Sequence, residues 1–286
     1  MKPSNLPLIV EDQPDADDLV IVRQGLNTYN MTFGFPPVTE LATFVRDESG
    51  NAVGGAYGEL GWGWLYIDLL WLDESRRGQG EGARLIYTLE QAALVRGVEH
   101  IHLATTSFQA LPFYHSIGYR LFGTLENRPP GWNYYYLRRQ VQFDPITTLE
   151  VTDTPAVDDM TALKRGLSAH NRSRGAKADG KRLAIFLRDA DGAIHGGLLG
   201  ATYWGWFDLQ EFWLDAPYRG QGIGSEMLAL AETEALVRSC PHVMVDVADF
   251  QVTDFFHRRG YIDFAVLEDR PPGHKTHFMK KHLQKS

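Results

Sequence analysis

The sequence predicts an α/β (α+β) protein made of two tandem copies of one module. An internal repeat is the first observation, because Arg77-Gly78-Gln79-Gly80-Glu81-Gly82 recurs 142 residues later as Arg219-Gly220-Gln221-Gly222-Ile223-Gly224. The second observation is that flanking residues recur at the same spacing, because Trp71-Leu72-Asp73 is repeated as Trp213-Leu214-Asp215. The third is a matching order of strand-like and helix-like segments in both halves. We therefore predict domains at 1–140 and 149–286, with the linker at 141–146.

Comparison of the halves places each element in chain order. A short strand leads to a helix that begins with a proline and two acidic residues, as a first helical turn favours. Two strands joined by an Asp/Gly turn follow, and then a long strand, the glycine segment, an amphipathic helix, a strand, a short helix and a closing hairpin. The main predicted ranges in the first half are 6–10, 41–46, 64–72, 100–105, 110–117, 119–125 and 133–138. A one-residue shift between 30 and 40 predicts a loop where the two halves differ most.

Composition and charge restrict the possible functions. With 286 residues, of which 44% are hydrophobic, the chain can form two cores of ordinary size. The net charge of −8 argues against a nucleic-acid binder and against a polybasic membrane anchor. Cys240 is the single cysteine, so we predict neither a disulfide nor a metal site. We recognise no signal peptide and no membrane-spanning stretch in the sequence, and we therefore expect a cytoplasmic protein.

The glycine segment has the chemistry of an anion cradle. A glycine turn between a strand and a helix leaves backbone N–H groups free at the positive end of the helix dipole, where a pyrophosphate can bind. The segment is not a Walker motif, because no Lys-Ser/Thr pair follows, and it lacks the G-x-G-x-x-G spacing of dinucleotide folds. The alternative is that the glycines only allow a tight start of the helix.

In its context the segment resembles that of the GNAT superfamily (GCN5-related N-acetyltransferases). The resemblance rests on Arg-x-x-Gly-x-Gly after the long strand and on Phe113-Tyr114-His115-Ser116-Ile117-Gly118-Tyr119 downstream, and it covers both halves. It implies mixed, mostly antiparallel sheets flanked by helices, each with a splayed acyl-CoA cleft and acetyl-CoA as cosubstrate. The residues implied to bind acetyl-CoA are Leu70, Trp71, Leu72, Arg77, Gly78, Gln79, Gly80, Glu81, Gly82, Phe212, Trp213, Leu214, Arg219, Gly220, Gln221, Gly222, Ile223 and Gly224.

The two halves differ at the predicted catalytic positions. In the family, the tyrosine of the Phe-Tyr step serves as the acid for the departing thiolate, which implies this role for Tyr114, whereas its counterpart is Phe256. Asp68 on the long strand is the candidate base, on the face of Leu70 and Leu72 if no bulge intervenes. Its counterpart is Gln210, and the adjacent Glu211 is a weaker candidate. Packing of Tyr114 against the cofactor and a solvated Asp68 remain the alternatives.

The acceptor is the least determined part of the prediction. Five residues lie where the family builds its acceptor wall: Asn27, Tyr29, Asn30, Phe33 and Phe35. We predict transfer of acetyl from acetyl-CoA to a primary amine of a small molecule, with catalysis in the N-terminal module. Two alternatives remain, namely activity of both modules on different acceptors and a non-catalytic acyl-CoA sensor. The sequence leaves the oligomeric state open.

Overall fold

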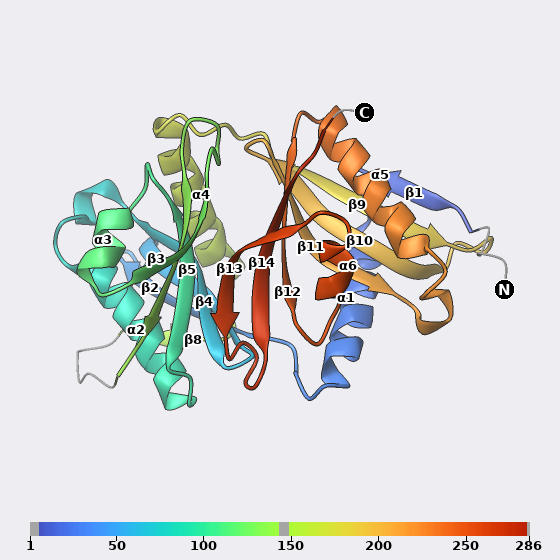
Figure 1. Ribbon diagram of the computed structural model, residues 1–286. Helices are drawn as coiled ribbons and strands as arrows, with labels where there is room; N and C mark the ends of the chain where they lie inside the picture. Colours follow the sequence, from blue (N-terminus) through green and yellow to red (C-terminus); the bar gives the residue numbers. More distant parts are fainter. Residues whose placement is uncertain (1–5, 143–148, 285–286) are drawn as a thin grey trace.

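The computed structural model describes residues 6–142 and 149–284 and contains two seven-stranded sheets, each with helices on both faces (Figure 1). The predicted order of elements is confirmed in both halves. The first half contains β1 (Leu8–Glu11), α1 (Ala16–Met31), β2 (Thr39–Arg46), β3 (Ala52–Gly61), β4 (Trp64–Leu72), α2 (Glu81–Val95), β5 (His100–Thr106), α3 (Leu111–Ser116), β6 (Arg120–Leu125) and β7 (Tyr134–Gln140).

The second half repeats this series closely. It contains β8 (Val151–Thr152), α4 (Val157–Ser173), β9 (Lys181–Arg188), β10 (Ile194–Tyr203), β11 (Trp206–Leu214), α5 (Ile223–Val237), β12 (His242–Ala248), α6 (Thr253–His257), β13 (Ile262–Glu268) and β14 (Lys275–His282). A single 3₁₀ turn follows the long strand in each half, at Glu74–Arg76 and Ala216–Tyr218.

The sheet topology is mixed and mostly antiparallel. The strand orders are β6-β7-β5-β4-β3-β2-β8 in the first sheet and β1-β9-β10-β11-β12-β14-β13 in the second. Among the described strands, β4 with β5 and β11 with β12 are the parallel pairs, and the other neighbours are antiparallel. The family-like sheet implied by the sequence is therefore confirmed.

The first strand and helix of each half belong to the sheet of the other half. β1 pairs with β9, and α1 packs on β10 and β11, whereas β8 pairs with β2 and α4 packs on β3 and β4. Figure 1 shows α1, in blue, among the orange and red elements of the second sheet. The two sheets are thus joined by exchanged elements as well as by a common interface.

Glycine and tryptophan residues allow the exchanged helices to approach the sheets closely. Gly25 of α1 lies against the indole of Trp213, and Gly166 of α4 lies against Trp71, where a Cβ atom would overlap the ring in either case. The boundaries 1–140 and 149–286 stay a prediction for the sequence units. The packed sheets do not follow them, because each sheet takes its first strand and helix from the other unit. The predicted linker at 141–146 lies mostly outside the described residues.

An apolar cluster and a buried ion pair join the sheets. Trp64 and Trp206 lie in the cluster, together with Leu125, Tyr136, Met244, Ala265, Leu267 and Phe278. Arg128, whose side chain is 1% exposed, donates from Nη2 to Oδ2 of Asp208 at 2.5 Å. A buried charge is tolerated only when it is paired, and here the partners come from different halves. This pair therefore fixes the position of one sheet relative to the other.

Candidate active site

Each sheet opens in the middle of its long strand. β4 pairs with β5 only as far as Ile67 opposite Leu103, and β11 pairs with β12 only as far as Leu209 opposite Val245. Six of the residues expected to bind acetyl-CoA lie beyond these last pairs: Leu70, Trp71 and Leu72 on β4, and Phe212, Trp213 and Leu214 on β11. Backbone N–H groups in such an opening can bind a carbonyl or amide oxygen of a ligand.

A β-bulge lies at the same point in each long strand. Tyr57 pairs with Leu69 and Gly58 pairs with Ile67, so Asp68 has no partner on β3. In the second sheet, Gln210 of β11 likewise has no partner on β10. We call the opening at Asp68 the first site and the opening at Gln210 the second site. A β-bulge changes the direction of a side chain and is common next to active sites, and in the second site Gln210 at the bulge lines a cavity.

The bulge corrects the predicted orientation of Asp68. Leu70 packs with the core around α2, whereas Leu69 and Trp71 pack with the cluster around α4. Tyr66 Oη donates to Oδ1 of Asp68 at 3.5 Å, and the positive charge of Lys164 on α4 opposes the rise in the pKa of the same carboxylate. Asp68 thus faces α4 rather than sharing the face of Leu70 and Leu72, as it would in a regular strand. Glu211, the weaker candidate, is bound to Arg23 of α1 at 2.7 Å.

Three carboxylates gather near the bulge of the first site. The pKa of Glu59 is raised mainly by burial, and the negative charges of Asp68 and Glu40 raise it further. Asp68 retains an exposed surface, but the surrounding protein removes part of its hydration and raises its pKa, against the opposing charge of Lys164. The equivalent residues in the second half are Arg182, Ala201 and Gln210. The first site is therefore the acidic one, and sequence reasoning had missed Glu40 and Glu59, although their replacement in the repeat was a usable signal.

Tyr114 and Phe256 occupy equivalent places on α3 and α6. Tyr114 is 6% exposed and packs edge-on against Phe113 and Tyr119, and burial raises its pKa. A raised pKa keeps the phenol protonated at neutral pH, as a proton donor must be. Phe256 lines the cavity of the second site, where it offers no proton.

The glycine segments have a backbone suited to an anion. Gly78 and Gly80 have φ of 74° and 82°, Gly220 and Gly222 have φ of 73° and 90°, and no atom lies within 4 Å of a Cβ built on any of the four. Arg77 Nε donates to the carbonyl of Leu72 at 3.0 Å, and Arg219 Nε donates to Leu214 at 2.8 Å. No side chain caps α2 or α5, so their first N–H groups remain available for phosphate oxygens. The segments fit a pyrophosphate.

The remaining residues of the two segments have similar contacts, except at the position of Glu81 and Ile223. Gln79 and Gln221 each bind a carbonyl of the preceding 3₁₀ turn. Ile223 is buried in the core of the second sheet, whereas Glu81 at the same place lies 3.6 Å from Arg76. A Cβ atom at Gly82 would lie at ordinary contact distance from Leu72 and Phe113, and one at Gly224 would lie slightly closer to Phe212.

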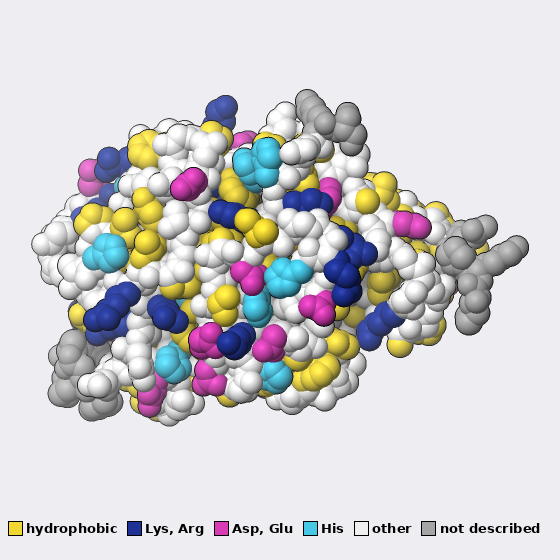
Figure 2. Space-filling view, viewed as in Figure 1, with side chains coloured by type: hydrophobic (Ala, Val, Ile, Leu, Met, Phe, Trp, Pro, Cys, Tyr) yellow, Lys and Arg dark blue, Asp and Glu magenta, His cyan; other side chains and the backbone are white. Residues whose placement is uncertain are grey.

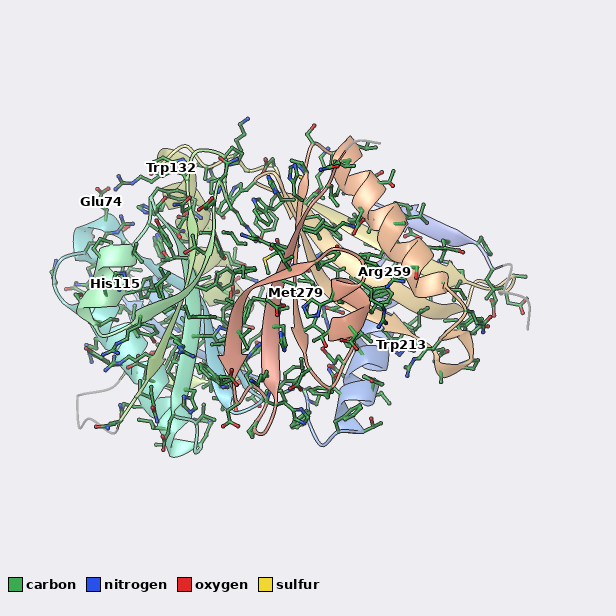
Figure 3. All side chains as sticks on the ribbon, in the orientation of Figure 1. Glu74, His115, Trp132, Trp213, Arg259 and Met279 are labelled. Carbon is green, nitrogen blue, oxygen red and sulfur yellow. The ribbon has the colours of Figure 1, made fainter. Side chains whose placement is uncertain are left out.

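A cavity of about 560 Å³ occupies the second site. It extends from Arg219, Gly220 and Gly222 to Gln210 at the bulge. Figure 3 shows Arg259, two residues after the end of α6, beside α5, and it shows Trp213 on the side of α1. The guanidinium of Arg259 lies 3.7 Å from the ring centre of Phe255 and binds Ser225 Oγ.

The helix that lines this cavity comes from the first half of the chain. Leu26, Tyr29 and Asn30 of α1 line the second site, and Asn30 Oδ1 accepts a hydrogen bond from Gln251 at 2.9 Å. The first site has the equivalent contact between Asn171 of α4 and Gln109 at 2.7 Å. The expected acceptor wall around Tyr29 therefore belongs to the second site. A single half of the sequence contains no signal for this exchange.

Comparison with known proteins agrees with this geometry. The family model described as "Acetyltransferase (GNAT) family" matches residues 23–119 and 146–261. The chain belongs to the GNAT acetyltransferase family. Blasticidin-S acetyltransferase of Streptomyces morookaense is 38% identical over 106 residues, which are 37% of this chain and 78% of that protein. An acetyltransferase of Agrobacterium fabrum is 29% identical over 131 residues, which are 46% of this chain and 96% of that protein.

Two solved structures each match a little under half of this chain. An acetyltransferase from Bacillus cereus matches with a TM-score of 0.42 and 26% identity, over 46% of this chain and 95% of that one. One from Agrobacterium tumefaciens matches with a TM-score of 0.45 and 29% identity, over 46% and 98%. The family model itself matches this acetyltransferase twice, once in each half of the sequence.

The surface of the acetyltransferase has mixed charge on the face seen in Figure 2, where Lys and Arg side chains are interspersed with Asp, Glu and His. Among residues 6–142 and 149–284, no helix is long and apolar enough to cross a membrane. Within the same ranges, no three His, Cys, Asp or Glu side chains are grouped in a way that could hold a metal ion.

Proposed function

We propose that this chain is an acetyl-CoA-dependent N-acetyltransferase whose first site acetylates a primary amine of a cationic small molecule. The observation that carries the proposal is the set of three carboxylates at the first site, Glu40, Glu59 and Asp68. Like charges that crowd together raise one another's pKa, and a bound cation relieves this repulsion. The second site lacks all three acids, which is why we assign the cationic acceptor to the first.

The residues of the first site have separate roles in the proposed reaction. Acetyl-CoA supplies the acetyl group as a thioester. Asp68 accepts one proton from the ammonium group, so that the neutral nitrogen can bond to the acetyl carbon. A backbone N–H in the open half of β4 stabilises the negative charge on the carbonyl oxygen. As the C–S bond breaks, Tyr114 protonates the thiolate, and the second proton lost by the nitrogen restores the phenol.

A screen of acceptors tests the substrate class. The wild-type chain is mixed with acetyl-CoA and one amine, and released CoA is measured with a thiol reagent. We expect spermidine and kanamycin to be acetylated at least tenfold faster than glycinamide, because additional positive charges meet Glu40 and Glu59. Blasticidin S belongs in the panel because a relative is named for it.

Glu59→Gln isolates the contribution of the acidic cluster. It should raise KM for the best cationic acceptor about tenfold, since one close charge pair contributes roughly 1–3 kcal/mol. Glu48→Gln is the matched control, because Glu48 is an exposed turn residue. Equal KM values for Glu59→Gln and Glu48→Gln, or no preference for polycations, would reject the cationic acceptor.

Both glycine segments are proposed to bind acetyl-CoA. Calorimetry should give two equivalents per chain, and Gly80→Asp or Gly222→Asp should each weaken one site at least tenfold, because the new carboxylate repels the phosphates. Gly192→Asp is the matched control, since Gly192 has φ of 86° in a hairpin turn with no atom near its Cβ position. A stoichiometry of one that Gly222→Asp does not change would leave the second segment without a ligand.

A further inference from the structure

The second site has a carboxylate of its own on the neighbouring strand. Gln210 and Asp246 are the first residues after the last parallel pair of β11 and β12, Leu209 with Val245. The same two places in the first site hold Asp68 and Ala104. We call the point where the two parallel strands separate the apex of the opening. Each site therefore has one aspartate at its apex, on the long strand in the first site and on the adjacent strand in the second.

Asp246 is accessible from the cavity of the second site. It lines the cavity together with Gln210 and Phe256, and its side chain is 47% exposed. Oδ2 of Asp246 lies 3.6 Å from Nη1 of Arg270. The two charges attract each other at this distance, but the atoms are too far apart for a direct hydrogen bond. The carboxylate thus keeps its capacity to accept hydrogen bonds from a ligand.

An aromatic wall lies beside this carboxylate. Trp62, from the β3–β4 hairpin of the first half, lines the cavity, and its ring centre lies 6.0 Å from Cζ of Arg270. The ring of Phe250 lies 6.0 Å from Trp62 and 5.0 Å from Phe35. Trp62 has φ of 56°, so the hairpin holds this indole in place through an uncommon backbone conformation. A flat apolar group can pack against such a wall.

We propose that the second site acetylates a primary amine carried on a flat apolar group, with Asp246 as its amine-binding carboxylate and proton acceptor. This inference rests on the proposed binding of acetyl-CoA at Gly222. The ammonium group gives one proton to Asp246, and the nitrogen then bonds to the acetyl carbon as the C–S bond breaks. The second proton of the nitrogen reaches the departing thiolate through water, so atoms and charge balance.

Phe256 is compatible with this reaction. A thiol has a pKa of roughly 8.5, and an alkyl ammonium has a pKa of roughly 10. A thiolate is thus a weaker base than the attacking amine and can leave without a dedicated acid. Removal of the first proton from the ammonium remains necessary, and at the apex of the second site Asp246 is placed to accept it.

Tryptamine is the probe, with released CoA as the signal and spermidine as the substrate of the first site. We expect Gly222→Asp to lower tryptamine turnover at least tenfold and to leave spermidine turnover within twofold, and Gly80→Asp to do the reverse. Asp246→Asn should lower kcat/KM for tryptamine at least tenfold with acetyl-CoA stoichiometry still two. Asp191→Asn, in an exposed hairpin turn, is the control for loss of an aspartate.

A second variant separates chemistry from folding. Gln210→Asp in the Asp246→Asn background returns a carboxylate to the apex, in the arrangement of the first site, and should recover tryptamine turnover at least threefold. No tryptamine turnover in the wild type, or turnover unchanged in Asp246→Asn, overturns the inference when calorimetry still gives two equivalents of acetyl-CoA. A stoichiometry of zero instead overturns the proposed function itself.

Discussion

Replacing Tyr114 by phenylalanine is expected to lower kcat for the cationic acceptor by about 100-fold, because a positioned general acid contributes at least this much. The substitution removes one oxygen atom from a ring that is held by Phe113 and Tyr119. The aromatic packing is kept, and acetyl-CoA affinity should change little. Steady-state kinetics with spermidine, together with calorimetry for acetyl-CoA, measure the two quantities separately.

Tyr119→Phe is the control for a purely structural effect. Tyr119 is also buried, and its hydroxyl donates to Oε1 of Glu90 at 2.8 Å. Its loss leaves a buried carboxylate with one partner fewer, so Tm should fall while kcat changes less than threefold. If Tyr114→Phe keeps more than a third of the wild-type kcat, the phenol packs against the cofactor without donating a proton.

The repeat allowed the sequence to predict nearly every element. Agreement between the two halves supported each predicted strand and helix, as at β5 and β12. The glycine segments were predicted because they recur 142 residues apart, each between a strand and a helix where free backbone N–H groups can bind an anion. The structure adds that Gly78, Gly80 and their counterparts have positive φ, which few other residues adopt.

The exchange of β1 and α1 with β8 and α4 could not be predicted from the pattern. Gly25 and Gly166 are equivalent, and so are their partners Trp213 and Trp71. Either helix therefore has the surface to pack on either sheet, and the sequence pattern is satisfied in both arrangements. The choice depends on how the chain connects the units in space, which is a tertiary property.

The bulge left a signal that was not used. Gly58 and Gly200 lie opposite the two bulges, and a Cβ at either position would crowd the backbone carbonyl of Tyr66 or Asp208. A glycine inside a strand is typical of a bulge or of a close backbone approach. Used in this way, the two glycines would have predicted a bulge at Asp68 and removed it from the face of Leu70 and Leu72, although the helix on the opposite face could not be predicted.

Replacing Asp68 by asparagine is expected to lower kcat/KM for the cationic acceptor by about 100-fold at neutral pH, since a positioned general base contributes at least this much. An alkyl amine with a pKa of roughly 10 is about 99.9% protonated at pH 7, so a proton must be removed before attack. Asparagine keeps the size and position of the side chain at the bulge but cannot accept this proton. Acetyl-CoA binding should be unchanged.

The pH profile separates this role from a structural one. A carboxylic acid cannot act as a base, so activity should be present above the pKa of Asp68 and lost as the pH falls through it. The partial loss of hydration raises that pKa, which moves the acid limb above the usual range of an aspartate. In Asp68→Asn this limb should disappear, and only the rise that follows deprotonation of the free amine should remain. Glu48→Gln should retain the wild-type profile. An acid limb that persists in Asp68→Asn would assign proton removal to another group, and Glu59, which interacts electrostatically with Asp68, is the next carboxylate to test.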